Sequence, residues 1–523
     1  MTPEPINKPK YKVSNSLTSY YLLIMFTFFP LFLTESYAHA RTDKYWLFMA
    51  LTLILFIGTA VTTVINSSEN KRIGVKEHFL LPLTSTDICM LCFFGFAAIS
   101  TVLSAYPLDS LTGNAGRNNG LILIGMYLIA YFIVSRFYVF KEYVIAGYLV
   151  FSSGVALLAV LNFYYIDPFG ILDGYSADVV EDFGTTIGNK NTIASFMCLF
   201  LPVAVMMFVL AQKRYLKILS GVSIGIAYGG LICANSNSGY LGFAVILMVM
   251  LIFCARDFEK FKNYMLGLVI LFGSGKLLRL FSYIMSDRSK SFEAIPKFLL
   301  FSPYMFIPIG FFLLIYLLMT LLGRPMEKAY KGRLMTGIFI TLFAVCVTGL
   351  VGAFIYFTNI DTTTDLGSLE RLLRFDDRWG THRGFMWING MKEFSDFDFI
   401  HMLFGSGPDT FYHVFEPHFE ELLSRFGDSS TDCIHNEYLN YLITQGIFGL
   451  AAYLGLLGCG TFRAVKKSFQ NPLTLVFISG VLCYAVQSVV NLYQPITTPT
   501  LFLFLAISEG ICRVSEERIE KRE

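Results

Sequence analysis

The chain has 523 residues, 55% of them hydrophobic and 15% charged, with a formal net charge of +2. This composition departs from that of ordinary soluble domains in the direction that long apolar runs produce. Unpaired backbone amides are costly in hydrocarbon, and helices satisfy them internally. The sequence therefore predicts an all-α polytopic membrane protein, and it contains no series of alternating apolar strands of the kind that form a barrel.

About 12–14 stretches are apolar enough to cross a bilayer as helices, which takes ~20 residues each. The predicted spans are 20–34, 46–66, 87–104, 120–135, 143–165, 192–211, 218–234, 240–255, 263–284, 298–322, 334–357, 436–457, 472–491 and 496–512. The ninth stretch contains Lys276 and Arg279. We retain it as a span, because without it the later cationic loops would face outward.

Lysine and arginine clusters indicate the orientation, since cationic loops stay in the cytoplasm. The clusters are Lys8/Lys10/Lys12, Lys71/Arg72/Lys76, Lys213/Arg214/Lys217, Arg256/Lys260/Lys262, Arg324/Lys328/Lys331/Arg333, Arg463/Lys466/Lys467 and the tail from Arg513. They predict a cytoplasmic tail (1–19), a transmembrane region (20–357), a large extracytoplasmic loop (358–435), C-terminal transmembrane helices (436–512) and a second cytoplasmic tail (513–523). Loops near 105–118 and 166–191 would also be extracytoplasmic.

The segment 358–435 is the one long polar interruption of the chain. It holds five of the seven histidines, two of the three tryptophans, and fourteen acidic against six basic residues. Within it, Arg383–Phe394 has the spacing of an amphipathic helix, a second helix is expected at about 417–426, and Gly405-Ser406-Gly407-Pro408 is a turn. We therefore expect a folded outer loop with short helices.

The N-terminal region superficially resembles a signal peptide with a cleavage site at Ala38-His39-Ala40, but an uncleaved first helix is favoured. Cys89 and Cys92 have a redox spacing inside an apolar run without basic neighbours, so we expect no redox role. Cys433 has no obvious disulfide partner in the large loop.

Four polar clusters are expected to face the same compartment. His435 precedes Asn436 and Tyr438 at the outer mouth of a span, where an imidazole suits a general base, although a His-Asn helix cap is the simpler interpretation. Gly113–Gly120 combines backbone amides with Arg117, as an anion cradle or as a flexible turn.

The other two clusters also have a structural alternative. Arg383 and Trp387 lie four residues apart on one helical face, where they would grip a diphosphate and stack on a sugar, or simply form a cation–π pair. Lys190, between Asn189 and Asn191, favours an anion at a helix N-terminus, or Asn191 only caps that helix.

With these motifs in order, the chain resembles the O-antigen ligase and O-antigen polymerase superfamily of bacterial polytopic membrane glycosyltransferases. The matching elements are Gly116-Arg117-Asn118-Asn119-Gly120, Gly188-Asn189-Lys190-Asn191, Ser236-Asn237-Ser238-Gly239-Tyr240-Leu241-Gly242, Arg383 with Trp387, Phe404-Gly405-Ser406-Gly407, and His435-Asn436-Glu437-Tyr438-Leu439 with Gly446-Ile447-Phe448-Gly449. They cover roughly residues 105–460.

The resemblance implies a GT-C-like helical fold and a glycan donor linked by diphosphate to a polyprenyl lipid, usually undecaprenyl, in the bacterial cytoplasmic (inner) membrane. It implies inverting transfer to a hydroxyl at the outer face, with no cofactor, metal or nucleic acid. His435 would be the base, and Arg117 and Arg383 would hold the diphosphate. A metal site at His413 and His418 with Glu420 fits no standard spacing.

One departure concerns Asn237, where the family often has arginine. Lys276, Arg279 or Lys190 is the expected substitute for that diphosphate-binding cation. The acceptor, whether glycan, lipid or protein, stays open, as does the choice between a ligase and a polymerase. A transporter of lipid-linked sugar or of a small anion is the rival from another class, and it would need more charges in the spans. A structural assembly partner with an inert loop is the third alternative.

Overall fold

The computed structural model describes residues 12–69, 82–113 and 117–520. Most of these residues are helical, and the strands among them are β1 (Phe183–Gly184) and β2 (Gly188–Asn189), which pair antiparallel. The all-α polytopic membrane fold is confirmed. The predicted basic clusters at Lys8–Lys10 and Lys71–Lys76, and the loop residues Asn114–Gly116, lie outside the described residues.

Each of the fourteen predicted spans falls on a helix. These helices are α1 (Lys12–Thr27), α2 (Ala40–Glu69), α4 (Ser85–Leu103), α6 (Leu121–Phe137), α7 (Glu142–Phe163), α9 (Lys190–Leu210), α10 (Arg214–Cys233), α11 (Asn237–Cys254), α12 (Phe258–Ile284), α14 (Phe306–Ala329), α15 (Gly332–Asn359), α21 (Glu437–Lys467), α22 (Thr474–Gln487) and α23 (Thr498–Glu520). Ten helical stretches of the described residues have the length and composition to cross a membrane. The shorter α6 and α22 are apolar as well.

Three predicted spans differ in detail from the helices that they match. The first, 20–34, coincides with α1 only as far as Thr27. The ninth is one continuous helix of 27 residues, α12, so Lys276 and Arg279 do not interrupt it. The tenth, 298–322, begins in a separate short helix, α13 (Ala294–Phe301), and reaches α14 only after a 3-10 turn that Pro303 opens. Proline suits the start of a helical turn, where its missing N–H is not needed.

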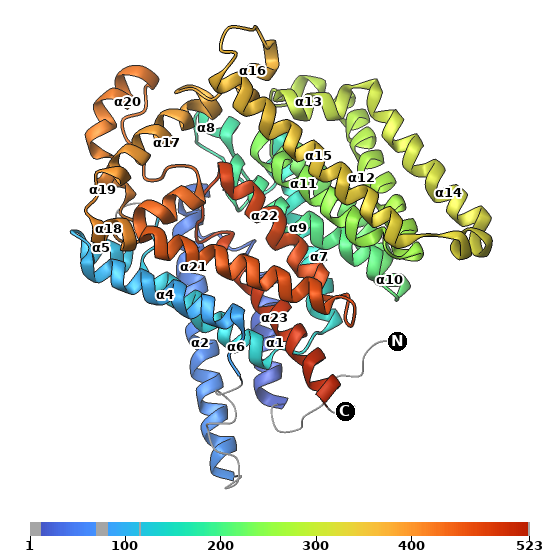
Figure 1. Ribbon diagram of the computed structural model, residues 1–523, viewed down its shortest axis with the longest axis horizontal. Helices are drawn as coiled ribbons and strands as arrows, with labels where there is room; N and C mark the ends of the chain where they lie inside the picture. The colour runs from blue at the N-terminus through green and yellow to red at the C-terminus, as the bar shows by residue number, and fades with distance from the viewer. Residues whose placement is uncertain (1–11, 70–81, 114–116, 521–523) are drawn as a thin grey trace.

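Helix α9 forms the centre of the membrane domain, with 94% of its most apolar stretch buried. Helices α7, α10, α11 and α22 pack around it. Helix α14 lies at the edge of the molecule, and α15 runs along its surface against α11 (Figure 1). Only 11% of the most apolar stretch of α14 is buried, and 0% of that of α15. Their exposed apolar side chains suit contact with lipid.

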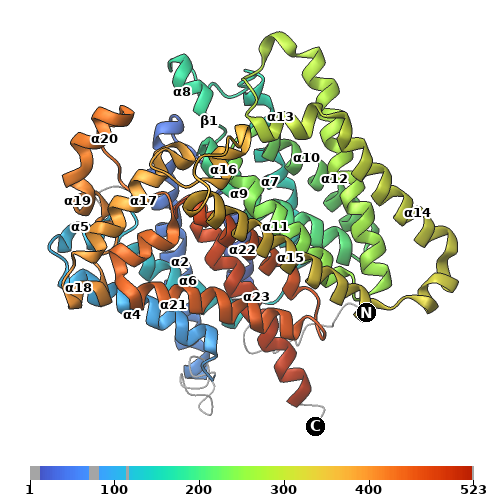
Figure 2. The same cartoon turned by 45° about the horizontal axis from the view of Figure 1, so that its top comes forward.

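The polar segment folds into short helices over a small apolar core. It contains α16 (Glu370–Leu373), α17 (Trp379–Ser395), α18 (Phe399–Phe404), α19 (Phe411–Phe415) and α20 (Phe419–Phe426), with 3-10 turns at Gly367–Leu369 and Glu416–His418. The core includes Phe385, Phe411, Phe415, Leu422 and Ile434. Both helices predicted in this segment are thus present. They gather at the end of the molecule away from the tips of α2 and α23 (Figures 1 and 2).

The remaining short elements connect the membrane helices. They are α5 (Pro107–Thr112), α8 (Ala177–Asp182) and 3-10 turns at Tyr37–His39, Ser286–Arg288 and Ser488–Val490. Between the last of these turns and α23, residues 491–497 form a loop that is buried throughout. Such non-helical backbone needs polar partners, and the loop finds them on α9, as described below.

Candidate functional site

His435 precedes Asn436, the residue that caps the N-terminus of α21. The capping role belongs to its neighbour Asn436, whose Oδ1 accepts from the backbone amides of Tyr438 and Leu439 at 3.0 and 3.1 Å. His435 has a left-handed φ of +52°, which costs a residue with a side chain about 1–2 kcal/mol. Its Nδ1 is buried, and no group in the described residues bonds to it.

The surroundings of His435 keep its imidazole neutral. Burial lowers the pKa of His435 to about 3, the positive charges of Arg383 and Arg117 lower it too, and Asp432 acts in the opposite direction. At neutral pH the ring is therefore in the form that accepts a proton. An anion bound to the two arginines would offset their charge and make the imidazole more basic.

Arg117 reaches Asp432 from a distant part of the sequence. Its Nε donates to Asp432 Oδ1 at 2.9 Å, and a terminal guanidinium nitrogen lies 2.7 Å from the same oxygen. Arg41, at the start of α2, lies 3.9 Å from Asp432 Oδ2. Burial raises the pKa of Asp432, but the charges of Arg117 and Arg41 outweigh it and leave the pKa below its ordinary value. Two arginines thus share one carboxylate.

Asp409 holds the Arg117 loop in place from the other side. Its Oδ2 accepts from the backbone amides of Arg117 and Asn119 at 3.0 and 3.1 Å. Asp409 is 5% exposed, and burial raises the pKa of its carboxyl to about 7. Asp409 and Asn118 both have left-handed φ angles. The position of Arg117 therefore depends on a loop that follows α18, far along the chain.

Arg383 follows a tight left-handed turn. Gly380, Thr381 and His382 have φ angles of +61°, +63° and +55°, and a Cβ at Gly384 would lie 1.8 Å from the backbone oxygen of Asp376. Among the described residues, the Arg383 side chain has neither a hydrogen bond nor an ion pair. A partly buried guanidinium without an anionic partner, close enough to His435 to act on its pKa, is suited to bind an anion.

Trp387 is bound to the backbone beside His435. Its Nε1 donates to the carbonyl oxygen of Ile434 at 3.0 Å. The sequence also allowed a cation–π pair between Arg383 and Trp387, and the described part of the chain does not contain that pair. The aromatic residues that arginines stack on there are Phe132, Phe469, Tyr283, Phe385 and Phe426. Trp387 thus fixes the segment before His435, and Arg383 stays unengaged.

The cluster at the start of α9 belongs to a neighbouring polar network. Asn189 Oδ1 caps the helix through the amide of Asn191 at 2.9 Å, and Lys190 pairs with Asp182 at 2.7 Å. Asn191 accepts from Ser236 Oγ at 2.6 Å, and its backbone oxygen accepts from Asn491 at 3.1 Å. The expectation that Asn191 caps this helix is wrong, because the capping side chain is that of Asn189.

The buried loop 491–497 joins this network to the Arg117 loop. Asn119 Nδ2 donates to the backbone oxygen of Tyr493 at 3.3 Å, and Gln494 Nε2 donates to Thr192 Oγ1 at 2.5 Å. Asn440 Nδ2 donates to Tyr493 Oη at 2.8 Å. Three of the four predicted clusters therefore meet through hydrogen bonds or electrostatic contact, and the α9 cluster connects to them through this loop.

Lys276 and Arg279 have partners of their own. Lys276 Nζ donates to the backbone oxygens of Leu300 and Ser302 at 2.9 and 2.8 Å, at the end of α13, and Arg279 bonds Tyr283 Oη. Asn237, at the position that lacks a family arginine, is exposed. The structure instead brings Arg41 to Asp432. No sequence motif marked Arg41, although it directly follows Ala38-His39-Ala40.

The other histidines of the polar segment each face a carboxylate. The pairs are His382 with Asp428 at 2.7 Å, His401 with Asp398 at 2.7 Å, His413 with Asp109 at 3.0 Å and His418 with Glu393 at 2.8 Å. Glu420 is not the partner of His413 or His418. Within the described residues, no group of three or more His, Cys, Asp or Glu side chains is placed to hold a metal ion.

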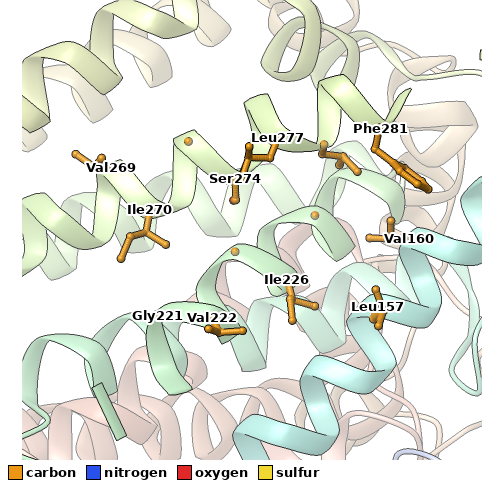
Figure 3. Close-up of a pocket in the computed structure, with 14 residues that line it drawn as sticks. Leu157, Val160, Gly221, Val222, Ile226, Val269, Ile270, Ser274, Leu277 and Phe281 are labelled. Carbon is orange, nitrogen blue, oxygen red and sulfur yellow. The ribbon is translucent and has the colours of Figure 1, made fainter. Parts of the chain in front are cut away.

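A groove of about 750 Å³ lies elsewhere, between α7, α10 and α12. Figure 3 shows its lining, which includes Leu157, Val222, Ile270, Leu277 and Phe281 and is apolar except for Ser274. This lining suits hydrocarbon, and it contains no group for acid–base chemistry or for binding charge.

Residues 298–454 match a family model described as O-antigen ligase. The match runs from within α13 to the middle of α21 and includes Arg383, Asp409, Asp432 and His435, whereas Arg41 and Arg117 precede it. No curated protein matches the chain.

Proposed function

We propose that this chain, a member of the O-antigen ligase and polymerase superfamily, transfers a glycan from a polyprenyl diphosphate to an acceptor hydroxyl at the membrane surface. The matched domain supports membership and a glycosyltransferase-like activity in general. The observation that carries the finer proposal is the Arg383 guanidinium, which has no partner among the described residues and acts on the neutral His435. A diphosphate supplies the anion that Arg383 lacks, and an acceptor hydroxyl supplies the proton that His435 takes.

In the proposed reaction, the acceptor oxygen forms a bond to the anomeric carbon while the bond from that carbon to the diphosphate breaks. The electron pair stays with the polyprenyl diphosphate, and the hydroxyl proton passes to His435. Arg383 and Arg117 stabilise the charge that develops on the leaving group. Direct displacement inverts the anomeric configuration.

The remaining candidates have supporting roles in this proposal. Asn189, Lys190 and Asn191 contact the donor from the α9 side, and Trp387, Asn436 and Tyr438 position the segment around His435. Asn436 and Tyr438 have the contacts for this, since Tyr438 Oη donates to the backbone oxygen of Ala485. Lys190, Lys276 and Arg279 are the weaker donor-binding candidates, because all three side chains already have partners.

We assign the site to the outer face of the bacterial cytoplasmic membrane, with both termini in the cytoplasm. The positive-inside rule supports this orientation. The polar helices also gather at the end of the molecule opposite the tips of α2 and α23 (Figure 2). The donor is then a lipid-linked glycan of that leaflet, undecaprenyl diphosphate being the usual carrier in the family.

Purified protein with a polyprenyl-diphosphate-linked glycan tests the proposal. Release of polyprenyl diphosphate should depend on an added acceptor and should be lost in His435→Ala. A growing glycan as acceptor would identify a polymerase, and a lipid or protein acceptor a ligase. Movement of intact donor across proteoliposomes, with no acceptor-dependent release, would support the transporter and refute the transferase.

A further inference from the structure

Four aromatic side chains form a continuous cluster around the turn that precedes Arg383. Ring centroids lie 5.1 Å apart for Trp379 and Trp387, 5.7 Å for Phe375 and Trp379, and 5.9 Å for Phe375 and Trp387. Phe354, near the end of α15, lies 6.4 Å from both Phe375 and Trp379. All four side chains are only partly buried. The cluster therefore presents flat aromatic surface rather than forming a closed core.

Backbone geometry, not helical periodicity alone, brings the two tryptophans together. The left-handed turn at Gly380–His382 separates them, and the amide of Phe385 donates back to the oxygen of Asp377 at 3.1 Å. His382 secures the turn through Asp428 at 2.7 Å. Trp387 in turn bonds the carbonyl of Ile434, the residue before His435. The aromatic surface thus adjoins the proposed reaction centre.

The indole of Trp379 lacks a hydrogen-bond acceptor. Its Nε1 is buried, and no described residue accepts from it. Buried indole N–H groups normally find a partner, since an unmet donor is costly. By contrast, the second indole of the cluster is satisfied by Ile434. The protein itself covers the Trp379 N–H, so a ligand on the open side of the cluster meets aromatic ring surface rather than this donor.

We propose that Phe375, Trp379 and Trp387 form a binding platform for a pyranose ring of the glycan at the reaction centre. A pyranose offers a face of C–H bonds that packs against an aromatic ring, which suits the partly exposed rings of the cluster. The inference rests on the proposed function, because only a glycan substrate brings a sugar to this place.

A membrane-interface role is the main competing interpretation, since tryptophans also gather at the lipid headgroup level. Arg383 has no partner among the described residues, and a diphosphate bound to it would bring its attached sugar close to these rings. A lipid headgroup would also supply a phosphate to Arg383, so it is the position of the cluster that favours a sugar. Trp387 bonds the carbonyl of Ile434, the residue before the proposed base, and the proposed reaction places the transferred sugar there.

Tryptophan fluorescence tests the platform directly, because the chain has three tryptophans and the third, Trp46, is 63% exposed on α2. In full-length Trp46→Phe protein, all tryptophan emission comes from Trp379 and Trp387. The probes are the methyl glycosides of glucose, galactose, rhamnose and N-acetylglucosamine, with sorbitol as an acyclic control. We expect a saturable change in emission with at least one glycoside and none with sorbitol.

Variants then connect the platform to turnover. Trp379→Leu should remove the fluorescence response of Trp387 and raise the acceptor or donor KM roughly 3- to 10-fold, with kcat little changed. Trp379→Phe should restore most of the affinity. Phe399→Leu is the matched control, since Phe399 is a 74% exposed aromatic residue of the same polar segment outside the cluster. Thermal unfolding checks that each variant is folded.

The outcomes separate the platform from the proposed function. No response to any glycoside, together with quenching by brominated lipid tails, would overturn the platform in favour of a membrane-interface role. Wild-type kinetics in folded Trp379→Leu would also overturn it, while loss of transfer in His435→Ala would still support the transferase. A saturable glycoside response in a protein without transfer activity would support the platform and refute the proposed function.

Discussion

The backbone N–H of Gly407 donates to the carbonyl oxygen of Thr444 at 2.8 Å, and the neighbouring N–H of Ser406 donates to Ile443 at 3.0 Å. These carbonyls are available because α21 breaks at Gly446, which has a φ of +71°, and a break leaves the preceding carbonyls without their usual partners. The turn that contains Ser406 and Gly407 and the break in α21 at Gly446 are thus hydrogen-bonded to each other, although they are separate in the sequence. This joint supports both the Asp409 loop and the segment that carries His435.

Gly446→Ala should destabilise this joint. An alanine Cβ would lie 2.2 Å from the backbone oxygen of Leu403, and the left-handed φ adds about 1–2 kcal/mol. We expect a loss of about 2 kcal/mol or more, read as a lower unfolding midpoint in detergent, with reduced transfer. The control is Gly458→Ala on the same helix, where nothing lies within 4 Å of the added Cβ. Equal midpoints for the two variants would contradict the prediction.

The pH dependence of transfer should report the environment of His435. Its pKa is lowered to about 3 in the free protein, and only the neutral ring accepts a proton. The acidic limb of kcat/KM should therefore lie well below the ordinary histidine pKa of 6.5. A bound diphosphate offsets the charges of the two arginines. The acidic limb of the kcat profile should therefore lie at higher pH than that of the kcat/KM profile. If the acidic limbs of the kcat/KM and kcat profiles both lay near pH 6.5, His435 would not be a base that burial keeps neutral.

Arg383→Gln should lower kcat/KM by roughly 10²-fold, the usual cost of losing one group that stabilises developing charge. It should also move the acidic limb of kcat/KM to higher pH, because the charge of Arg383 lowers the pKa of His435. Arg378→Gln is the control, since Arg378 is exposed in the same segment. A purely structural role of Arg383 would change the unfolding midpoint without moving the limb.

Asp409→Asn should alter the dependence of stability on pH. Burial raises the pKa of Asp409 from 3.8 to about 7, so between these values the folded protein holds a proton that the unfolded chain has released. Stability from this group is therefore present at low pH and falls as pH rises from about 4 to 7. Asparagine still accepts from Arg117 and Asn119 but does not titrate.

The unfolding midpoint, measured from about pH 4 to pH 8, checks this prediction. The Asp409→Asn variant should lack part of the decline that the wild type shows over that window. Asp396→Asn, at an exposed carboxylate of the same segment, serves as control and should leave the decline unchanged. An unaltered decline in the Asp409→Asn variant would mean that the buried carboxyl does not carry the proton.

The fold class, the helices and the polar segment could be predicted from the sequence, because each depends on local properties. Apolar length predicts a membrane helix wherever it occurs, and all fourteen predicted stretches fall on helices. Spacing and turn residues likewise predicted α17 and α20. Residue type and motif also single out His435, Arg117 and Arg383 as candidates, and in the structure both arginines lie close enough to act on the pKa of His435.

The surroundings of these residues became visible only in the folded chain. Arg41 and Asp432 belong to opposite ends of the sequence, yet their side chains lie 3.9 Å apart, and Asp409 supports Arg117 across 292 positions. No local pattern marks such partners, since each is set by how distant helices pack. The same holds for Lys276, which binds carbonyls of α13, and for Trp379, whose place beside Trp387 follows from a left-handed turn. Long-range packing, rather than composition or spacing, selects the groups that complete the site.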